Sequence, residues 1–308
     1  ISLLFNFIIM KNLAVLTSGG DSPGMNACIR AIVRSAIHKN INTFGIQYGY
    51  DGLINNNIKI LLPEEVSNTI HIGGTILKSA RSEEFFSKKG RKKAYQNLKM
   101  NNIDGMIVLG GDGSLTGAKI FGDEFKFNII GIPCTIDNDI YGTDYSIGFA
   151  TARETIVNSI DKIRDTAASH ERIFIVEVMG RESGYLALES GVASGAELIL
   201  IPENKNSMKD VINKLKKINN KKKSVIIVYA EGCKFGSLNE LSKKIKNSIS
   251  NSNVRFSILG HIQRGGIPSP SDRILASILG YESINQITKG ITNKMIGIKN
   301  QNPILINL

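Results

Sequence analysis

The chain has 308 residues, of which 42% are hydrophobic and 21% charged, and its 38 Lys and Arg against 27 Asp and Glu give a formal net charge of +11. This composition excludes a disordered chain, and the length allows one large α/β domain or two of ordinary size. Cys28, Cys134 and Cys233 are too few for a disulfide framework, and no apolar run reaches the roughly 20 residues of a membrane helix, so we expect a cytoplasmic protein with reduced thiols and no membrane partner.

The chain starts with an apolar run, residues 1–9, that precedes Met10. The run lacks both the basic start and the small-residue cleavage site of a secretory signal. We expect Met10 to be the natural start and residues 1–9 not to be native, with a short targeting segment as the alternative.

Strand-like apolar runs then alternate with amphipathic helical patterns. The expected strands are 12–17, 43–47, 106–109, 128–132 (ended by Pro133), 173–178, 198–201, 225–230 and 255–259. The expected helices are 24–39, 91–101, 149–168, 184–194, 209–219, 238–249 and 272–287. Continuous Val and Ile runs separated by helices predict parallel sheets that are covered on both faces, and the long helix from 149 is a candidate domain junction.

Three loops that leave strands carry the residues for chemistry, and parallel sheets bind ligands beyond the carboxyl ends of their strands. The first, residues 17–26, reads TSGGDSPGMN and can bring backbone N–H groups and a helix N-terminus to an anion; a tight turn without ligand is the alternative. The second, residues 110–114, reads GGDGS and sets a carboxylate that can hold Mg²⁺ beside an open phosphate cradle; an Asp that caps the next helix is the alternative.

The third loop, residues 133–139, reads PCTIDND and has two carboxylates two residues apart after a buried strand. A positioned Asp can remove a proton from an attacking hydroxyl, and an Asx-rich turn is the alternative. Farther on, basic residues stand at expected strand ends, and two of them lie in the glycine-flanked segment GHIQRGG at 260–266. Arg and His together suit a phosphate monoester, although each alone is typical of a surface charge. These basic residues are Arg172, Arg181, Arg255, His261 and Arg264.

The three loops together resemble the bacterial-type ATP-dependent 6-phosphofructokinases. The matching stretches are 16–26, 73–81, 110–114, 135–143, 176–181 and 259–266, and the resemblance covers about residues 12 to 300. It implies two Rossmann-like parallel-sheet domains with the active site in the cleft between them. Residues 1–148 plus 263–308 would form the ATP-binding domain, and 149–262 the sugar-phosphate-binding domain.

The resemblance also implies a glycolytic kinase that transfers the γ-phosphoryl group of ATP to the 1-hydroxyl of fructose 6-phosphate, giving fructose 1,6-bisphosphate and ADP. Asp137 would be the general base, Thr135 and Arg181 would contact the transferring group, and Asp139 would support the site. The nucleotide would meet Gly20, Arg81, Ser82, Gly111, Asp112, Gly113 and Ser114, with Arg81 offsetting transition-state charge and Asp112 holding the cofactor Mg²⁺. The sugar phosphate would meet Thr135, Ile136, Asp137, Arg172, Met179, Gly180, Arg181, Glu231, Arg255, His261, Ile262, Gln263 and Arg264.

In the resembled family, the residues at Arg172 and Arg255 reach across from a neighbouring subunit, which implies a homotetramer. An effector site for ADP or phosphoenolpyruvate would be formed by Arg30, Arg34, Arg164, Gly195, Glu197, Lys222 and Lys223. The family pattern has basic residues where this chain has Pro63, Ile72 and Asn220, so the effector and the strength of allosteric control stay open. Relatives continue for a further helix beyond Leu308, and whether this chain forms a stable tetramer also stays open.

The phosphoryl donor has an alternative. Pyrophosphate-dependent relatives have Asp where this chain has Gly113 and Lys where it has Cys134. Gly113 leaves room for ATP, and Cys134 resembles a small residue more than a long cation, so we expect ATP. Nucleic acid is a further candidate partner for a charge of +11, but aromatic residues make up only 6% and do not interleave with basic ones, so we expect no nucleic-acid partner.

Overall fold

The computed structural model describes residues 10–205, 207–219, 222, 224–249 and 252–308, so the expectation for residues 1–9 lies outside the described residues. The described chain forms two compact units. Unit 1 comprises residues 10–135, 140–148 and 264–308, and unit 2 comprises 136–139 and 149–263. The expected domain boundaries at 148 and 263 put residues 136–139 in the first domain, whereas here this short segment packs with unit 2.

Unit 1 is built on one mixed sheet with the strand order β12-β11-β5-β4-β1-β2-β3. Strand β6 pairs in parallel with the carboxyl end of β5, at Cys134 and Thr135. The inner strands are parallel, and the edge strands β3 and β12 are antiparallel to their neighbours. The strands are β1 (Asn12–Ser18), β2 (Asn42–Ile46), β3 (Ile58–Ile60), β4 (Gly105–Gly110), β5 (Asn128–Thr135), β6 (Ile147–Gly148), β11 (Lys294–Lys299) and β12 (Asn302–Asn307).

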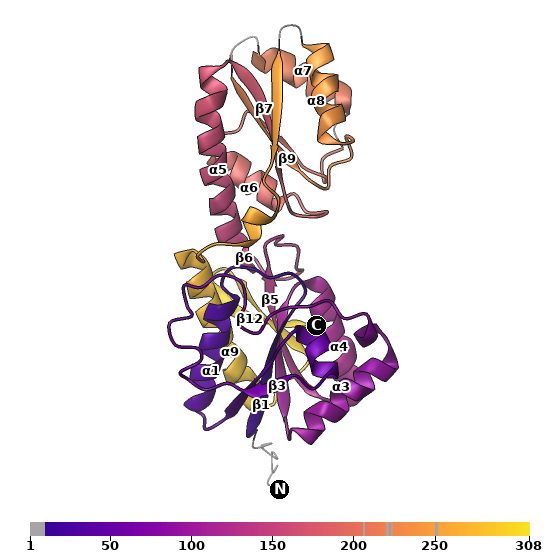
Figure 1. Ribbon diagram of the computed structural model, residues 1–308, viewed down its shortest axis with the longest axis vertical. Coiled ribbons are helices and arrows are strands. Elements are labelled where there is room, and N and C mark those ends of the chain that lie inside the picture. The colour runs from indigo at the N-terminus through magenta and orange to yellow at the C-terminus, as the bar shows by residue number, and fades with distance from the viewer. Residues whose placement is uncertain (1–9, 206, 220–221, 223, 250–251) are drawn as a thin grey trace. The chain divides into compact units, whose positions relative to one another are not determined.

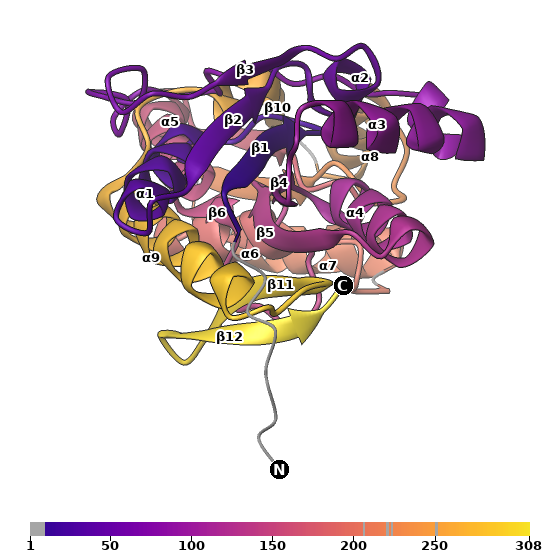
Figure 2. The same ribbon diagram turned by 90° about the horizontal axis from the view of Figure 1, so that it is seen from below.

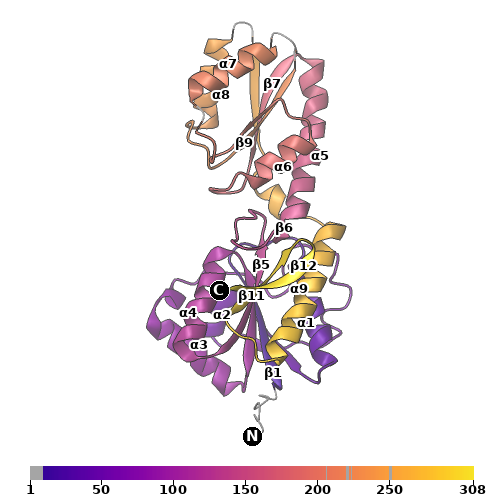
Figure 3. The same ribbon diagram turned by 180° about the vertical axis from the view of Figure 1, so that it is seen from behind.

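Helices cover both faces of this sheet, as Figures 2 and 3 show. Because side chains alternate along a strand, Leu13 and Val15 of β1 pack with α1 and α9, while Ala14 and Leu16 pack with α2, α3 and α4. The helices of unit 1 are α1 (Met25–Ile37), α2 (Gly49–Ile54), α3 (Lys88–Met100), α4 (Asp112–Phe125) and α9 (Pro270–Thr288), with a 3₁₀ turn η1 (Glu84–Phe86). Both faces being buried explains why the strands read as unbroken apolar runs.

Unit 2 has a parallel sheet with the strand order β10-β7-β9-β8. Figures 1 and 3 show α5 and α6 on one face of this sheet and α7 and α8 on the other. The elements are α5 (Phe149–Ser169), β7 (Arg172–Val178), α6 (Tyr185–Ala193), β8 (Leu198–Leu200), α7 (Met208–Asn219), β9 (Val225–Ala230), α8 (Leu238–Ser248), β10 (Asn253–Ile258) and η2 (Gly260–Arg264).

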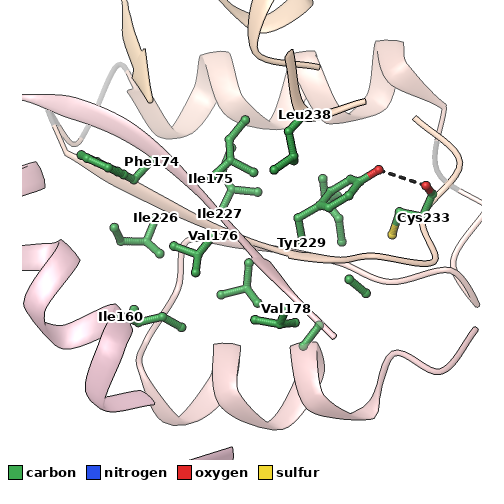
Figure 4. Packing of buried hydrophobic residues seen from close by; sticks show 14 of the residues in the cluster. Ile160, Phe174, Ile175, Val176, Val178, Ile226, Ile227, Tyr229, Cys233 and Leu238 are labelled. Atoms are coloured by element: carbon green, nitrogen blue, oxygen red, sulfur yellow. Dashed lines mark hydrogen bonds between the residues drawn. The ribbon is translucent and has the colours of Figure 1, made fainter. Parts of the chain in front are cut away.

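The core of unit 2 lies on both sides of β7 and β9, where Ile175, Val176, Ile226 and Ile227 are buried between the helices (Figure 4). One buried polar group enters this core: the hydroxyl of Tyr229 donates a 2.9 Å hydrogen bond to the carbonyl oxygen of Cys233. A buried hydroxyl without such a partner would be destabilising, so this bond lets a large aromatic ring fill the end of the core.

The expectation that Pro133 ends the strand 128–132 is wrong. Strand β5 continues through Pro133 to Thr135. Pro133 pairs with Gly110, which is the last residue of β4, and β11 contacts β5 only at Ile130 and Gly131. Proline has no N–H to donate, and it is tolerated here because the long inner pairings of β5 end at this point.

The three cysteines are buried and free, as the sequence predicts for reduced thiols. No helix in the described part of the chain combines the length and the apolar character that crossing a membrane requires.

Candidate active site

The centre of the sheet in unit 1 brings two of the predicted loops together. Strands β1 and β4 are parallel neighbours, so their carboxyl ends lie at the same edge, and the loops 18–24 and 110–114 leave from there. The chain after β1 runs to α1 on one face, and the chain after β4 runs to α4 on the other face. Such a reversal between neighbouring strands is where open parallel sheets bind ligands.

The glycines at the end of β4 have two different tasks. A Cβ added at Gly110 would lie 2.6 Å from Ser114 Cβ and 2.7 Å from the carbonyl oxygen of Ser18, so Gly110 is required for the close approach of β1 and α4. A Cβ added at Gly113 would meet nothing within 4 Å. Gly113 therefore borders open space at the first turn of α4, where backbone N–H groups and the helix dipole favour an anion.

Asp112 is the first residue of α4 and is exposed. Among the described residues, no cluster of three or more His, Cys, Asp or Glu side chains could hold a metal. Mg²⁺ in kinases is commonly held by one or two carboxylates together with phosphates and waters, so one exposed carboxylate beside an anion cradle fits a metal that arrives with its nucleotide.

A long loop carries Arg81 to the same edge of the sheet. The hydroxyl of Thr17 donates a 2.8 Å hydrogen bond to the carbonyl oxygen of Lys78, and the hydroxyl of Ser79 donates a 2.5 Å hydrogen bond to that of Gly19. Arg81 itself is exposed, and the hydroxyl of Ser82 is buried without a hydrogen-bond partner among the described residues. Thr17 and Ser79 thus fix the Arg81 loop beside the first glycine loop, a contribution that the sequence analysis did not detect.

Arg264 also reaches the first glycine loop. Its Nη1 donates a 3.4 Å hydrogen bond to the carbonyl oxygen of Asp21, and a Cβ added at Gly20 would lie only 2.5 Å from that Nη1. Gly20 therefore leaves the space that the guanidinium of Arg264 occupies. Thr135, at the end of β5, lies beside the second loop, since its Cβ is 3.6 Å from a Cβ added at Gly111.

In unit 2 the structure pairs Asp137 with Arg181. The distance between Asp137 Oδ2 and Arg181 Nε is 3.5 Å, and the side chain of Asp137 is 2% exposed whereas that of Arg181 is 56% exposed. The hydroxyl of Ser183 donates a 3.1 Å hydrogen bond to the carbonyl oxygen of Asp137, and Ile136 packs into the core of unit 2. A buried carboxylate beside a solvent-facing guanidinium can both accept a proton and neutralise a phosphoryl group.

The loop of residues 179–181, here called the Arg181 loop, is held by the side chains of Glu231, which follows β9, and Gln263, which lies in η2. Oε1 of Glu231 accepts hydrogen bonds from the backbone N–H groups of Gly180, at 3.2 Å, and Arg181, at 2.8 Å. Oε1 of Gln263 accepts a 3.1 Å hydrogen bond from the N–H of Met179. All three consecutive N–H groups of the loop therefore donate to side chains.

Of the five basic residues predicted at strand ends, two do not lie at a carboxyl end. Arg172 is the first residue of β7 and pairs with Asn253, and Arg255 lies within β10. Since a strand rises roughly 3.3 Å per residue, Arg172 and Val178 are about 20 Å apart. Within one chain, Arg172 and Arg255 are thus not brought to Asp137, and their contact with a neighbouring subunit's substrate stays a prediction. Asp139, His261 and Ile262 are exposed.

Part of the predicted effector site forms a cluster in unit 2. Oε1 of Glu197 lies 3.0 Å from Lys222 Nζ and 3.4 Å from Arg164 Nη1, and Nη2 of Arg164 donates to the carbonyl oxygens of Ser194 and Gly195. Burial would raise the pKa of Glu197, but a hydrogen bond from the N–H of Ile226, the hydrogen bond from Lys222 and the charge of Arg164 lower it below its usual value. Arg30 and Arg34 lie on α1 of unit 1, and Lys223 and Asn220 fall outside the described residues.

Comparison with known proteins agrees with this fold and these loops. Residues 12–287 match the family model described as phosphofructokinase. The chain is 49% identical over 290 residues to the ATP-dependent 6-phosphofructokinase of Cytophaga hutchinsonii (94% of this chain, 88% of that protein) and 52% identical over 295 residues to that of Staphylococcus epidermidis (94% and 90%).

Among solved structures, the chain is similar to Pichia pastoris phosphofructokinase in the T-state, with a TM-score of 0.91 and 35% identity over 97% of this chain. The match covers 35% of that chain, so this protein spans about a third of its length. The predicted α/β fold class with parallel-sheet domains is confirmed. The family match over most of the sequence and the curated relatives near 50% identity show that this chain belongs to the phosphofructokinase family.

Proposed function

We propose that this chain is an enzyme that transfers the γ-phosphoryl group of ATP to the 1-hydroxyl of fructose 6-phosphate, giving fructose 1,6-bisphosphate and ADP. The observation that carries the proposal is the ion pair of Asp137 and Arg181, in which Asp137 lies two residues after Thr135, the last residue of β5. The pair supplies a proton acceptor and a cation for phosphoryl transfer. Curated relatives that share about half of the sequence have the name ATP-dependent 6-phosphofructokinase.

The reaction is an in-line displacement. The 1-hydroxyl oxygen forms a bond to the γ-phosphorus, the bond from that phosphorus to the oxygen it shares with the β-phosphate breaks, and ADP leaves. The hydroxyl proton passes to the carboxylate of Asp137. Arg181 and Thr135 contact the moving phosphoryl group, and Arg81 offsets charge on the nucleotide, since positioning and charge neutralisation do most of the work in phosphoryl transfer.

The nucleotide half of the site belongs to unit 1 in this proposal. Gly20, Gly111, Gly113 and Ser114 line the phosphate cradle, and the buried hydroxyl of Ser82 is a donor that a bound ligand can satisfy. Asp112 would hold Mg²⁺, which supplies charge neutralisation at the phosphates when bound. Removal of Mg²⁺ with EDTA should abolish turnover, and excess Mg²⁺ should restore it.

The sugar phosphate is bound by the loops of unit 2 together with Arg264. Glu231 accepts hydrogen bonds from the Arg181 loop, which includes Met179 and Gly180. Arg264 provides the fork, and His261 the second donor, that suit a phosphate monoester. The geometry of Gln263 differs from that of a direct ligand: its side chain is fully buried, and both its amide groups bond to backbone.

Pyrophosphate is the competing phosphoryl donor. The open space at Gly113 favours ATP, since an Asp there would stand against its phosphates. Cys134 is fully buried in the core of unit 1, so it brings no charge to the donor. A coupled assay with fructose 6-phosphate and each donor, with and without Mg²⁺, tests the proposal. Turnover with ATP and none with pyrophosphate is expected, and the reverse result would refute ATP as the donor.

The proposal extends to assembly and control. A cytoplasmic homotetramer would bring Arg172 and Arg255 to a neighbouring subunit's substrate, and the cluster around Glu197 would receive a nucleoside diphosphate or phosphoenolpyruvate. Light scattering coupled to gel filtration measures the mass, and assays with ADP or phosphoenolpyruvate measure the control. A monomer with full activity would refute the role of the two arginines across the interface.

A further inference from the structure

Gln263 connects two loops of unit 2 through its side chain. Its Oε1 accepts a 3.1 Å hydrogen bond from the N–H of Met179, and its Nε2 donates a 2.9 Å hydrogen bond to the carbonyl oxygen of Gly260. The side chain is 0% exposed. A primary amide presents one acceptor and one donor group, and here each has a backbone partner in a different loop, which leaves none pointed at solvent.

The Arg181 loop needs such support because its backbone is strained. Gly180 has a φ of +137° and Arg181 a φ of +53°, which is the left-handed region that a non-glycine residue rarely adopts. Strained residues persist only where the surroundings over-determine them. Here three successive N–H groups, those of residues 179–181, are bound by Oε1 of Gln263 and Oε1 of Glu231.

We infer that Gln263 is a positioning residue that ties the Arg181 loop to the 3₁₀ turn η2, which carries His261, and so holds Arg181 against Asp137. The inference rests on the proposed function, in which Arg181 contacts the transferring phosphoryl group and His261 the sugar phosphate. One buried amide then couples the group that binds the sugar phosphate to the group that moves the γ-phosphoryl. Gln263 acts through these residues and does not contact the substrate.

The first test is Gln263→Met, which keeps the side-chain length and removes both hydrogen bonds. Without these bonds the Arg181 loop and η2 are no longer joined, so Arg181 and His261 should be slightly misplaced. Because small misplacements of catalytic groups slow reactions strongly, kcat should fall by about tenfold to a hundredfold and KM for fructose 6-phosphate should rise by about tenfold. KM for ATP should stay within twofold, since the nucleotide loops lie in unit 1. A purely structural role would lower the active fraction and leave KM unchanged.

The second test is Gln263→Glu, which adds a pH signature. A neutral carboxyl can accept from the N–H of Met179 and donate to the carbonyl oxygen of Gly260, whereas a carboxylate cannot donate and faces that oxygen unpaired. The kcat/KM of Gln263→Glu divided by that of wild type should therefore rise as the pH falls from 8 to 6. The same ratio for Gln263→Met should not change with pH. Glu177 on β7, Glu231 after β9, and His261 and Arg264 on η2 are further charged or ionisable side chains of these elements. The ratio of the variant to wild type cancels the effects that both enzymes share.

Ser190→Ala is the matched control, because it removes another buried hydrogen bond of unit 2, from the Ser190 hydroxyl to the carbonyl oxygen of Leu186 in α6. Its kcat and KM should stay within twofold of wild type. Hydrogen exchange of the peptide that spans residues 177–183 provides a readout without activity: Gln263→Met should speed it, and Ser190→Ala should not.

The following outcomes would overturn the inference or the proposed function. A Gln263→Met enzyme with kcat and KM for fructose 6-phosphate within twofold of wild type, or with unchanged exchange at residues 177–183, overturns it. If Gln263→Met does not fold, a pH-independent ratio for Gln263→Glu overturns it instead. A wild-type chain that transfers no phosphoryl group to fructose 6-phosphate refutes the proposed function, and the exchange experiment then still decides whether Gln263 holds the loop.

Discussion

The two units shape their loops by different means. Unit 1 uses glycines, which let backbone amides and Arg264 approach one another closely and leave open space at Gly113. Unit 2 uses polar side chains, because Glu231 and Gln263 bind the backbone of the Arg181 loop and Asp137 pairs with Arg181. Substitutions in unit 1 should therefore be harmful where they add atoms, and substitutions in unit 2 where they remove hydrogen bonds or charges.

The largest expected effect comes from the charged pair of unit 2. Asp137→Asn keeps the shape of the side chain but removes the proton acceptor, so kcat should fall by about 10²-fold to 10⁴-fold while KM for ATP stays within threefold. Steady-state kinetics with both substrates measures this. Asp161→Asn, an exposed carboxylate on α5, is the control and should leave kcat unchanged. Near-normal turnover of Asp137→Asn would falsify the role of Asp137 as general base.

The next largest effects are expected from substitutions of two glycines in unit 1. Gly113→Asp adds a carboxylate to open space, so the fold should tolerate it, while repulsion from the nucleotide phosphates should raise KM for ATP by at least about tenfold.

Gly110→Ala adds one methyl carbon where Ser114 and Ser18 leave no room, so it should lower Tm by several degrees. Calorimetry and kinetics on both variants separate the two tasks. Equal loss of stability in both would contradict this division.

The smallest effect is expected from Glu197 of unit 2, whose charge contributes to the stability of the fold. Glu197 has a pKa below its usual value, so its ionised form stabilises the fold above the pKa of the unfolded chain, and this stability is lost as the pH falls through the lower folded value. Glu197→Gln should lower Tm at pH 7 by about 2–4 °C, which corresponds to roughly 1 kcal/mol for a partly solvated network. The difference should shrink as the pH falls through the range in which Glu197 takes up its proton. Thermal scans across this range measure it, and a difference that grows towards low pH would contradict the assignment.

Many of the regular elements could be predicted from the sequence, but the short and edge ones could not. The bounds of helix α4 and the inner strand β11 were also not predicted. The inner strands are continuous Val and Ile runs because both faces of each sheet are covered, and the long helices have a clear apolar face. Helix α2 has six residues and β3 has three, which is too short for a periodic signal. Strand β12 contains Pro303 and is mostly exposed at the sheet edge, so nothing in its pattern marks it as a strand.

The sequence by itself determined the family, the three loops and the chemical types of residue in them, because glycines, carboxylates and arginines at fixed spacing reflect local backbone needs. Only the tertiary structure decided which residues meet. The bond from Met179 to Gln263 spans 84 residues and the bond from Arg181 to Glu231 spans 50, so no local pattern could indicate them. The packing of residues 136–139 with unit 2 likewise depends on the buried contacts of Ile136.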